Sequence, residues 1–379
     1  MDRRLWRVGC VILALFIIRI AALIGAFVAP FAPALNGADV VRVWEIAHER
    51  GQPYRDFPVE YGPLTTLIDR TMLAAPTIEG TEWRLALVNV VCDALVVVAL
   101  TTWGVRAAIA YLILSTPVMP FVYFRTDLLP VALLVAGLAL SLRGKERIGG
   151  LSVALGFLAK LWPAIAIPSL LYERWRAGVW ALVAAVVSTI AWLIWAPSGP
   201  WDVLSFRHAT GWQIESTIGA VLLASGAEPR LDQGAWRAGG SLPIARPLLI
   251  LVLAIGIGML WRYRRDVIAT TLAAIAVMLF VAPILSPQYV IWLLPFAAVC
   301  WARGDLDLAV PMAISALTLL VTALFLKSTI EQLPWLLIVV LLVRNALLPT
   351  LAYQALRARP RWNMLGRWVD RLALGVCVR

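Results

Sequence analysis

Long apolar runs, separated by short clusters of arginine and lysine, constrain the fold of this chain more than any other feature. Runs such as residues 8–30, 84–103 and 306–326 approach or exceed the length of about 20 residues that a helix needs to cross a bilayer. Hydrophobic residues make up 61% of the 379 residues and charged residues only 15%, whereas soluble domains are about half apolar and a quarter charged. The sequence therefore predicts an all-α, polytopic integral membrane protein.

The positions of the cationic clusters predict how the chain crosses the membrane. Cytoplasmic loops of membrane proteins carry an excess of lysine and arginine. All the strong clusters fall on one side if the chain makes about 12 membrane passes, some short or broken, with both termini in the cytoplasm. These clusters are Arg3/Arg4/Arg7, Arg143/Lys145/Arg147, Arg174/Arg176, Arg262/Arg264/Arg265 and Arg357/Arg359/Arg361.

This topology requires an unusual segment at residues 149–172. As one unbroken span it would place Arg174 and Arg176 outside, but Lys160, Pro163 and Pro168 interrupt it. Broken helices are tolerated in membranes where they line a polar cavity. We therefore expect two short half-spans that meet near Lys160 and return the chain to the cytoplasmic side.

We interpret residues 1–379 as a single membrane-embedded domain with two large extracytoplasmic loops. The first loop, 31–83, contains helices that lie in the membrane interface, one of them from Val40 to Ala47. The second loop covers 196–246. Residues 357–379 are predicted to form an amphipathic cytoplasmic tail.

The net charge of +11 raises the question of nucleic acid, which basic proteins often bind. The positive-inside rule already accounts for these cations, and we therefore expect no nucleic-acid partner. The chain has only two histidines and no CxxC pair, and its first loop lacks a DxD pair. We expect neither a metal ion nor another cofactor.

Most of the notable polar residues fall on the predicted outer face. Carboxylates there can take a proton from a nucleophile, and arginine or lysine can hold a departing phosphate. This combination suits a reaction on an anionic lipid at the bilayer surface. Arg19, in the middle of the first apolar run, is either functional or paired with an acid inside the bundle. The outer residues include Asp39, Asp56, Glu60, Arg125, Asp127, Lys160, Arg207, His208, Glu215, Ser286, Gln288 and Tyr289.

Five segments of the chain, taken in order, form a recognisable set. They are YRDFPVEYGPL from Tyr54, FRTDLLPVALL from Phe124, GFLAKLWPAIAIPSLL from Gly156, HATGWQIES from His208 and LSPQYVIWLLP from Leu285. Together they resemble glycosyltransferase family 87, the polyprenol-phosphate-mannose-dependent α-mannosyltransferases of the GT-C superfamily. One departure is Gly62, where this family commonly has a second proline. The last 80 or so residues carry no part of the resemblance.

The resemblance implies a GT-C-type helical bundle in the bacterial plasma membrane with its active site outside. The implied reaction moves a mannose, or a related sugar, from a polyprenyl-monophosphate donor to a lipid-linked or polysaccharide acceptor. It would be a single inverting displacement that needs one base, since phosphate leaves without protonation. An Asp in the first outer loop is that base in GT-C enzymes, and Asp39 stands at this place.

Each candidate residue has a second interpretation. Asp39 could instead cap the helix that follows it. Lys160 could pair with Asp127, and Asp56 and Glu60 could pair with Arg55. We expect contacts with donor phosphate or sugar from Lys160, Arg207, His208, Arg125, Gln288 and Tyr289, and acceptor-binding or loop-shaping roles for Tyr54, Asp56, Glu60, Tyr61 and Glu215.

Two other functions remain open from the sequence. A transporter or flippase for a lipid-linked sugar would use the broken segment around Lys160, although no paired repeat accompanies it. A glycan ligase would share the outer site and use a diphosphate donor. Sequence does not choose among the sugars, linkages or acceptors.

Overall fold

The computed structural model describes Gly9 and residues 12–21, 32–205, 210–232, 234–240, 245–262, 264–327 and 335–357. The predicted tail at 357–379 therefore lies outside the described residues, apart from Arg357. A first helical segment covers Ile12–Ala21. The main helices that follow are α2 (Ala32–His48), α3 (Pro63–Ile68), α4 (Ile78–Leu100), α5 (Val105–Ser115), α6 (Met119–Tyr123), α7 (Leu128–Leu142), α8 (Glu146–Ala159), α9 (Ile167–Glu173), α10 (Trp175–Trp195), α11 (Gly199–Ser205), α12 (Thr217–Ala224), α13 (Ala245–Arg262), α14 (Val267–Val281), α15 (Leu294–Ala302), α16 (Ala309–Lys327) and α17 (Trp335–Arg357).

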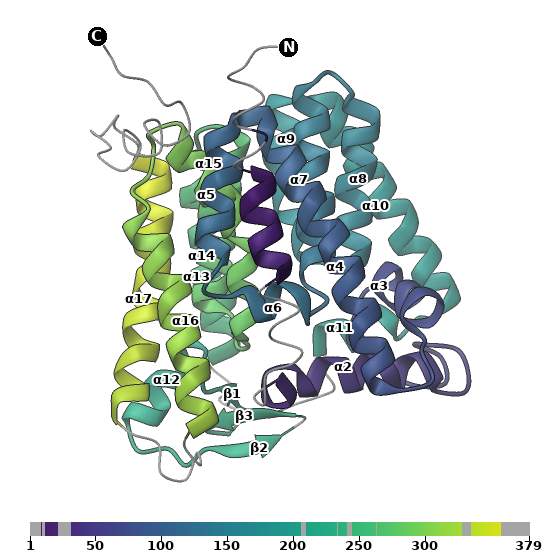
Figure 1. The fold of residues 1–379 in the computed structure, drawn as a ribbon, viewed down its shortest axis with the longest axis vertical. Coiled ribbons are helices and arrows are strands. Elements are labelled where there is room, and N and C mark those ends of the chain that lie inside the picture. Colours follow the sequence, from purple (N-terminus) through teal and green to yellow (C-terminus); the bar gives the residue numbers. More distant parts are fainter. Residues whose placement is uncertain are drawn as a thin grey trace.

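The fold is an all-α membrane bundle, as predicted (Figure 1). Three helices, Ile78–Trp103, Trp175–Trp195 and Trp335–Arg357, are long and apolar enough to cross a membrane, and shorter apolar helices lie among them. On α4, Leu87 and Val91 are more than 60% exposed. An apolar outer surface of this kind suits contact with lipid rather than water. The number of passes stays a prediction.

Among the described residues, the cations that follow α7, α9 and α13 and end α17 lie at one end of the bundle, as the predicted topology requires. The guanidinium of Arg264 lies 4.0 Å from the ring centroid of Tyr172, at the end of α9. Arg265 donates to the carbonyl of Ala355 near the end of α17 and pairs with Asp305, which follows α15. The ends of α9, α15 and α17 therefore meet the start of α14. Which side of the membrane this end faces stays a prediction.

The chain is broken at Lys160, as predicted. Helix α8 stops at Ala159, Lys160 is extended, a 3-10 turn follows at Trp162–Ala166, and α9 runs back. Gly178 near the start of α10 packs against Leu171 of α9, and Gly150 near the start of α8 packs against Ala177 of α10. The two half-spans thus return the chain to the end at which α8 began, and they leave the lysine partway through the bundle.

Other boundaries differ from the prediction. The apolar run at 107–124 is not one span but is split into α5 and α6, because Pro117 and Pro120 cannot donate to a helical ladder. Helix α2 begins at Ala32 rather than at Val40, since the good helix formers at its start carry the helix through Asn36 and Gly37. Asp39 is therefore inside α2, and its interpretation as the N-cap is wrong.

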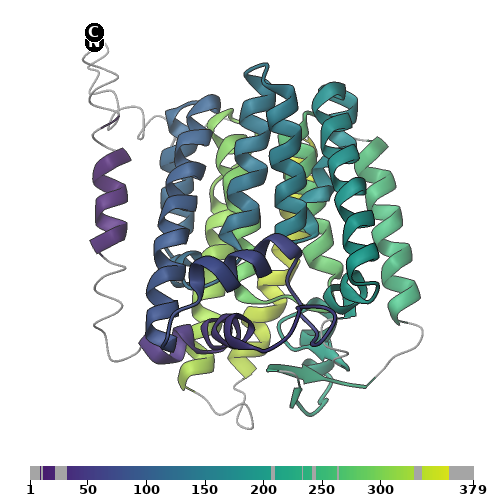
Figure 2. The ribbon, with the colours of Figure 1, turned by 90° about the vertical axis from the view of Figure 1, so that its right-hand side faces the viewer.

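The second outer loop contains a small sheet that was not predicted. Strands β1 (Trp212–Gln213), β3 (Ala235–Ala238) and β2 (Arg230–Asp232) pair antiparallel in the order β1-β3-β2. The sheet, α2, α11 and α12 gather at the lower end of the bundle in Figure 1, and α2 lies crosswise to the long helices. Figure 2 shows another face of this arrangement, with the first-loop helices across the lower part of the bundle.

The first outer loop is fastened directly beneath the short helix α8. The backbone N–H of Gly62 donates to the carbonyl of Ala159 at 3.2 Å, and the hydroxyl of Thr65 donates to the same oxygen at 2.8 Å. A Cβ atom at Gly62 would overlap the carbonyl oxygen of Leu158. The close approach of two backbones therefore requires glycine here. It places the first loop beside Lys160.

Candidate active site

A cavity of about 940 Å³ lies between the lower-end elements and the bundle. Its charged half faces α2 and the first loop, and its apolar half faces α13 and α14. The charged residues that line it are Asp39, Arg42, Glu45, Glu60, Arg125, Lys160 and Glu215, and uncharged polar side chains come from Tyr61, Gln213, Ser286, Gln288 and Tyr289. Most of the predicted site residues thus share one cavity.

Asp39 and Arg125 form an ion pair at the wall of this cavity. Nη1 of Arg125 lies 3.3 Å from Oδ1 of Asp39, and the side chains are 13% and 23% exposed. Nε and Nη1 of Arg125 are buried and make no hydrogen bond to the described residues. The Asp39 carboxylate, which is reachable from the cavity, thus lies beside a guanidinium that can still donate hydrogen bonds.

The Lys160 ammonium group is surrounded by one acid and two aromatic rings. Its Nζ donates to Oδ1 of Asp127 at 2.6 Å and lies 4.8 Å and 5.3 Å from the ring centroids of Tyr289 and Trp292. The indole N–H of Trp292 donates to the same carboxylate oxygen at 2.8 Å. The predicted alternative, a pair with Asp127, is therefore present. Lys160 still lines the cavity.

Glu60 pairs with Arg42 of α2 rather than with Arg55. Nε of Arg42 lies 3.1 Å from Oε1 of Glu60, and Nη1 of Arg42 also reaches Glu45 at 3.2 Å. The carboxylate of Asp56 accepts from the backbone N–H of Gln52 at 2.6 Å. Glu60 thus joins α2 to the loop at the cavity, whereas Asp56 shapes the exposed turn that precedes it.

Tyr54 lies outside the cavity lining and holds the loop that leads to Tyr61. Its φ of +65° is rare for a residue with a side chain. Its hydroxyl donates to the carbonyl of Tyr61 at 2.6 Å and lies 2.7 Å from the hydroxyl of Thr66. These bonds fix the turn that brings the Tyr61 side chain to the cavity.

Glu215 enters the cavity from the segment between β1 and α12. Its side chain is buried, and Oε2 accepts from Nε2 of Gln213 at 2.5 Å. Arg344 and Asn345 of α17 donate to its backbone carbonyl at 2.6 Å and 3.0 Å. Gln213 also donates to the hydroxyl of Ser286, at 3.2 Å. The second outer loop is therefore tied to α17 and to the turn before Gln288.

Burial raises the pKa of Glu215 to about 7, against the opposing effects of Arg344 and the Gln213 hydrogen bond. Because its pKa is higher when folded than unfolded, its contribution to stability is fully present below the unfolded pKa of about 4.3 and is lost as pH rises through 7. We expect Glu215→Gln to remove this loss of stability at high pH, because glutamine cannot ionise. The melting-temperature difference, Glu215→Gln minus wild type, should grow from pH 5 to pH 8. A constant difference over this range would contradict the assignment.

Tyr289 marks the point where the charged groups converge. It interacts electrostatically with Lys160, Asp127, Asp39 and Glu215, and its ring stacks on Trp292 with centroids 4.4 Å apart. The Tyr289 phenol therefore lies between the two outer loops.

Arg207 and His208 lie outside the described residues, so the structure does not place them. Sequence reasoning missed Arg42, Gln213, Arg344 and Asn345, all of which contact a site residue. Arg344 and Asn345 carried a signal in principle, because an arginine within an apolar span is costly unless it meets a partner. Arg42 carried no such signal, because an arginine on a short helix in an outer loop is usually solvated.

The apolar half of the cavity opens toward the outside of the bundle. Leu253 and Ile257 of α13 and Met278 and Leu279 of α14 line it. Ile257 is 50% exposed, and so belongs both to the cavity and to the surface that faces lipid. The cavity therefore joins a charged chamber to an apolar mouth. Among the described residues, no three His, Cys, Asp or Glu side chains group to hold a metal ion.

Comparison with known proteins gives one family and one structural neighbour. The model of glycosyltransferase family 87 matches residues 60–287, which is more than half of the chain and includes Glu60, Arg125, Lys160 and Glu215. The crystal structure of ArnT from Cupriavidus metallidurans, bound to undecaprenyl phosphate, aligns with 95% of this chain and 78% of its own, at 14% identity and a TM-score of 0.44. No curated protein matches the chain.

Proposed function

The chain belongs to glycosyltransferase family 87, and on that premise we propose that it moves a sugar from a polyprenyl monophosphate to an acceptor hydroxyl in this cavity. Mannose is our first candidate for the sugar, and a glycolipid or polysaccharide is the acceptor. We place the reaction at the extracytoplasmic face of a bacterial plasma membrane. No metal ion or other cofactor takes part in this proposal.

The observation that carries the proposal is the Asp39–Arg125 ion pair in a cavity that also holds Lys160. A sugar transfer from lipid phosphate needs a base for the acceptor and cations for the leaving phosphate. Asp39 supplies the carboxylate, and Arg125 stands beside it with unused donors. Lys160 interacts electrostatically with Asp39, so both cations are near the base.

In the proposed step, the oxygen of the acceptor hydroxyl forms a bond to the anomeric carbon of the donor sugar. The bond from that carbon to the phosphate oxygen breaks, and its electron pair leaves with the lipid phosphate. Asp39 takes the hydroxyl proton. Attack opposite to the leaving phosphate inverts the anomeric centre. Arg125 and Lys160 stabilise the charge that develops on the phosphate.

The other polar residues of the cavity hold the two substrates. Gln288 and Tyr289, which line the same cavity as Lys160, contact the donor sugar or phosphate. Glu215 and Tyr61 contact the acceptor, and the Arg42–Glu60 pair keeps α2 and the loop in register. Arg207 and His208 stay candidates for donor contacts.

The apolar half of the cavity takes the first isoprene units of the donor. We expect Ile257→Trp to raise KM for a long-chain donor about tenfold, equivalent to roughly 1.4 kcal/mol, because the larger ring fills the mouth at α13. A donor with a short, water-soluble chain should keep its KM. Ile255→Trp is the matched control, since Ile255 is 54% exposed on the same helix and does not line the cavity. Equal effects of both substitutions would contradict this path.

The proposed function is tested with purified protein in lipid and radiolabelled polyprenyl-phosphate mannose. A glycolipid extract of the source organism provides the acceptor, and donor is added only from outside. Transfer of label to a glycolipid supports the proposal. Transfer only from an arabinose or glucose donor would replace mannose by that sugar in the proposal. No transfer from any of the three, with donor appearing inside the vesicles instead, would establish a transporter.

A further inference from the structure

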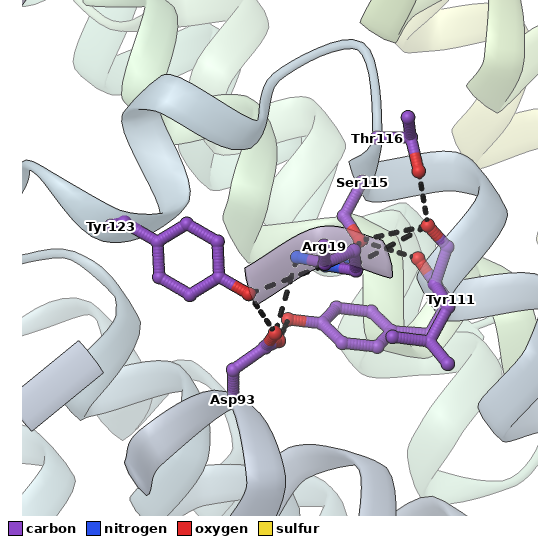
Figure 3. Close-up of polar contacts among 7 residues, drawn as sticks. Arg19, Asp93, Tyr111, Ser115, Thr116 and Tyr123 are labelled. Carbon is purple, nitrogen blue, oxygen red and sulfur yellow. Dashed lines mark hydrogen bonds and ion pairs between the residues drawn. The ribbon is translucent and has the colours of Figure 1, made fainter. Parts of the chain in front are cut away.

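A cluster of polar side chains is buried between the first helix and α4, α5 and α6 (Figure 3). Nη2 of Arg19 lies 3.2 Å from Oδ2 of Asp93, and the two side chains are 4% and 0% exposed. The hydroxyls of Tyr111 and Tyr123 donate to Asp93 at 2.6 Å and 2.8 Å. Arg19 is therefore paired with an acid, which was one of its two interpretations from the sequence.

Further donors of Arg19 are also satisfied. Nη1 donates to the hydroxyl of Ser115 at 2.6 Å, and Nε donates to the hydroxyl of Tyr123 at 3.3 Å. Charges inside a bilayer are costly unless they are paired and hydrogen-bonded. Rotation of Tyr123 away from this cluster would remove one hydrogen bond from Arg19 and one from Asp93. The cluster therefore fixes the Tyr123 side chain.

Asn89 connects this cluster to the cavity. It lies four residues before Asp93, on the same face of α4, and is 1% exposed. Its Nδ2 donates to the carbonyl oxygens of Tyr123 and Arg125, at 2.9 Å each. The first carbonyl ends α6 and the second lies in the turn to α7, where a helix end leaves such groups without an intrahelical partner. One amide thus fastens the chain on both sides of Phe124.

The Arg125 side chain makes few polar contacts with the described residues. Its Nε and Nη1 make no hydrogen bond to them, and its ion pair is with the Asp39 carboxylate. We propose that Asn89, supported by the buried Arg19–Asp93–Tyr123 cluster, is a positioning residue that holds Arg125 beside Asp39. This inference rests on the proposed function, in which Arg125 receives the donor phosphate.

The test uses Asn89→Leu, which keeps the number and branching of the side-chain heavy atoms and removes both donors. A shift of Arg125 by about 1 Å is expected to lower kcat/KM for the donor about 100-fold. Part of this loss in kcat/KM should come from a higher KM for the donor. The KM for the acceptor should stay at its wild-type value. A merely structural role would reduce the amount of active protein and leave both KM values at wild type.

A double-mutant cycle shows whether Asn89 acts through Arg125. If it does, the double variant Asn89→Leu/Arg125→Ala should lose no more kcat/KM than Arg125→Ala alone. If the two fold-losses in kcat/KM multiply in the double variant, the inference is overturned. Ser152→Ala is the matched control: it also removes a side-chain bond to a backbone carbonyl of another helix, that of Leu133, and should leave both KM values unchanged.

A milder substitution covers the case in which Asn89→Leu does not fold. Tyr123→Phe removes one hydroxyl of the cluster and should raise KM for the donor in the same direction. An unchanged donor KM in Tyr123→Phe and in every folded Asn89 variant would overturn the inference while the wild type still transfers sugar. Absence of transfer by the wild type would instead count against the proposed function.

Discussion

Replacing Asp39 by asparagine is expected to lower sugar transfer about a thousandfold, within the range that a general base contributes. The amide keeps the shape of the side chain and can still accept from Arg125, so the ion-pair geometry is disturbed little. It cannot take the proton of the acceptor hydroxyl. The measurement is initial transfer rate at saturating donor, with the melting temperature as the check on folding.

Glu49→Gln is the matched control for this substitution. Glu49 directly follows α2, is exposed, and does not line the cavity, so the same acid-to-amide change there should leave the rate within about twofold. Wild-type activity of Asp39→Asn would remove Asp39 as the base. It would leave the family membership untouched, because the family match begins at residue 60.

Replacing Gly62 by proline, the residue common at this position in the family, is expected to destabilise this protein by about 3 kcal/mol or more. The φ of −73° at Gly62 suits proline, so backbone conformation is not the obstacle. The obstacles are the lost hydrogen bond to Ala159 and the overlap of a Cβ atom with the Leu158 carbonyl. Both partners are backbone atoms and cannot move aside independently.

Folded yield and melting temperature measure this effect. Gly62→Ala separates the two causes, because alanine keeps the N–H and meets only the overlap. Gly258→Ala is the control: no atom lies near its Cβ position in α13, and alanine favours a helix interior. A melting temperature of Gly62→Pro equal to wild type would mean that the first loop is not fastened to α8 as described.

The bundle was predictable because its signals are local. A run of apolar residues must be helical in a membrane, since its backbone groups have no other partners there. The break at Lys160 followed from a charge and two prolines within a few residues. The start of α2 did not follow, because Asn36 and Gly37 resemble a loop, and the strands around Gln213 are too short to show a pattern.

The residues of the site were easier to predict than their partners. Asp39, Arg125, Lys160 and Glu215 were singled out by their charge, and the fold brings all four to one cavity. Their roles stay predictions. That Arg125 faces Asp39, or that α17 holds Glu215, depends on contacts between segments 86 and about 130 residues apart. No local pattern in the sequence encodes such pairs.

Each cation that lines the cavity among the described residues is paired, and this has a consequence for turnover. Arg42, Arg125 and Lys160 each already hold a carboxylate. In the proposed reaction the donor is a phosphodiester with one negative charge, whereas the released lipid phosphate is a monoester that carries nearly two at neutral pH. Unopposed cations would therefore bind the spent lipid more tightly than the fresh one. Carboxylates that compete for the same cations limit this retention, so the spent lipid can leave and the next donor can enter.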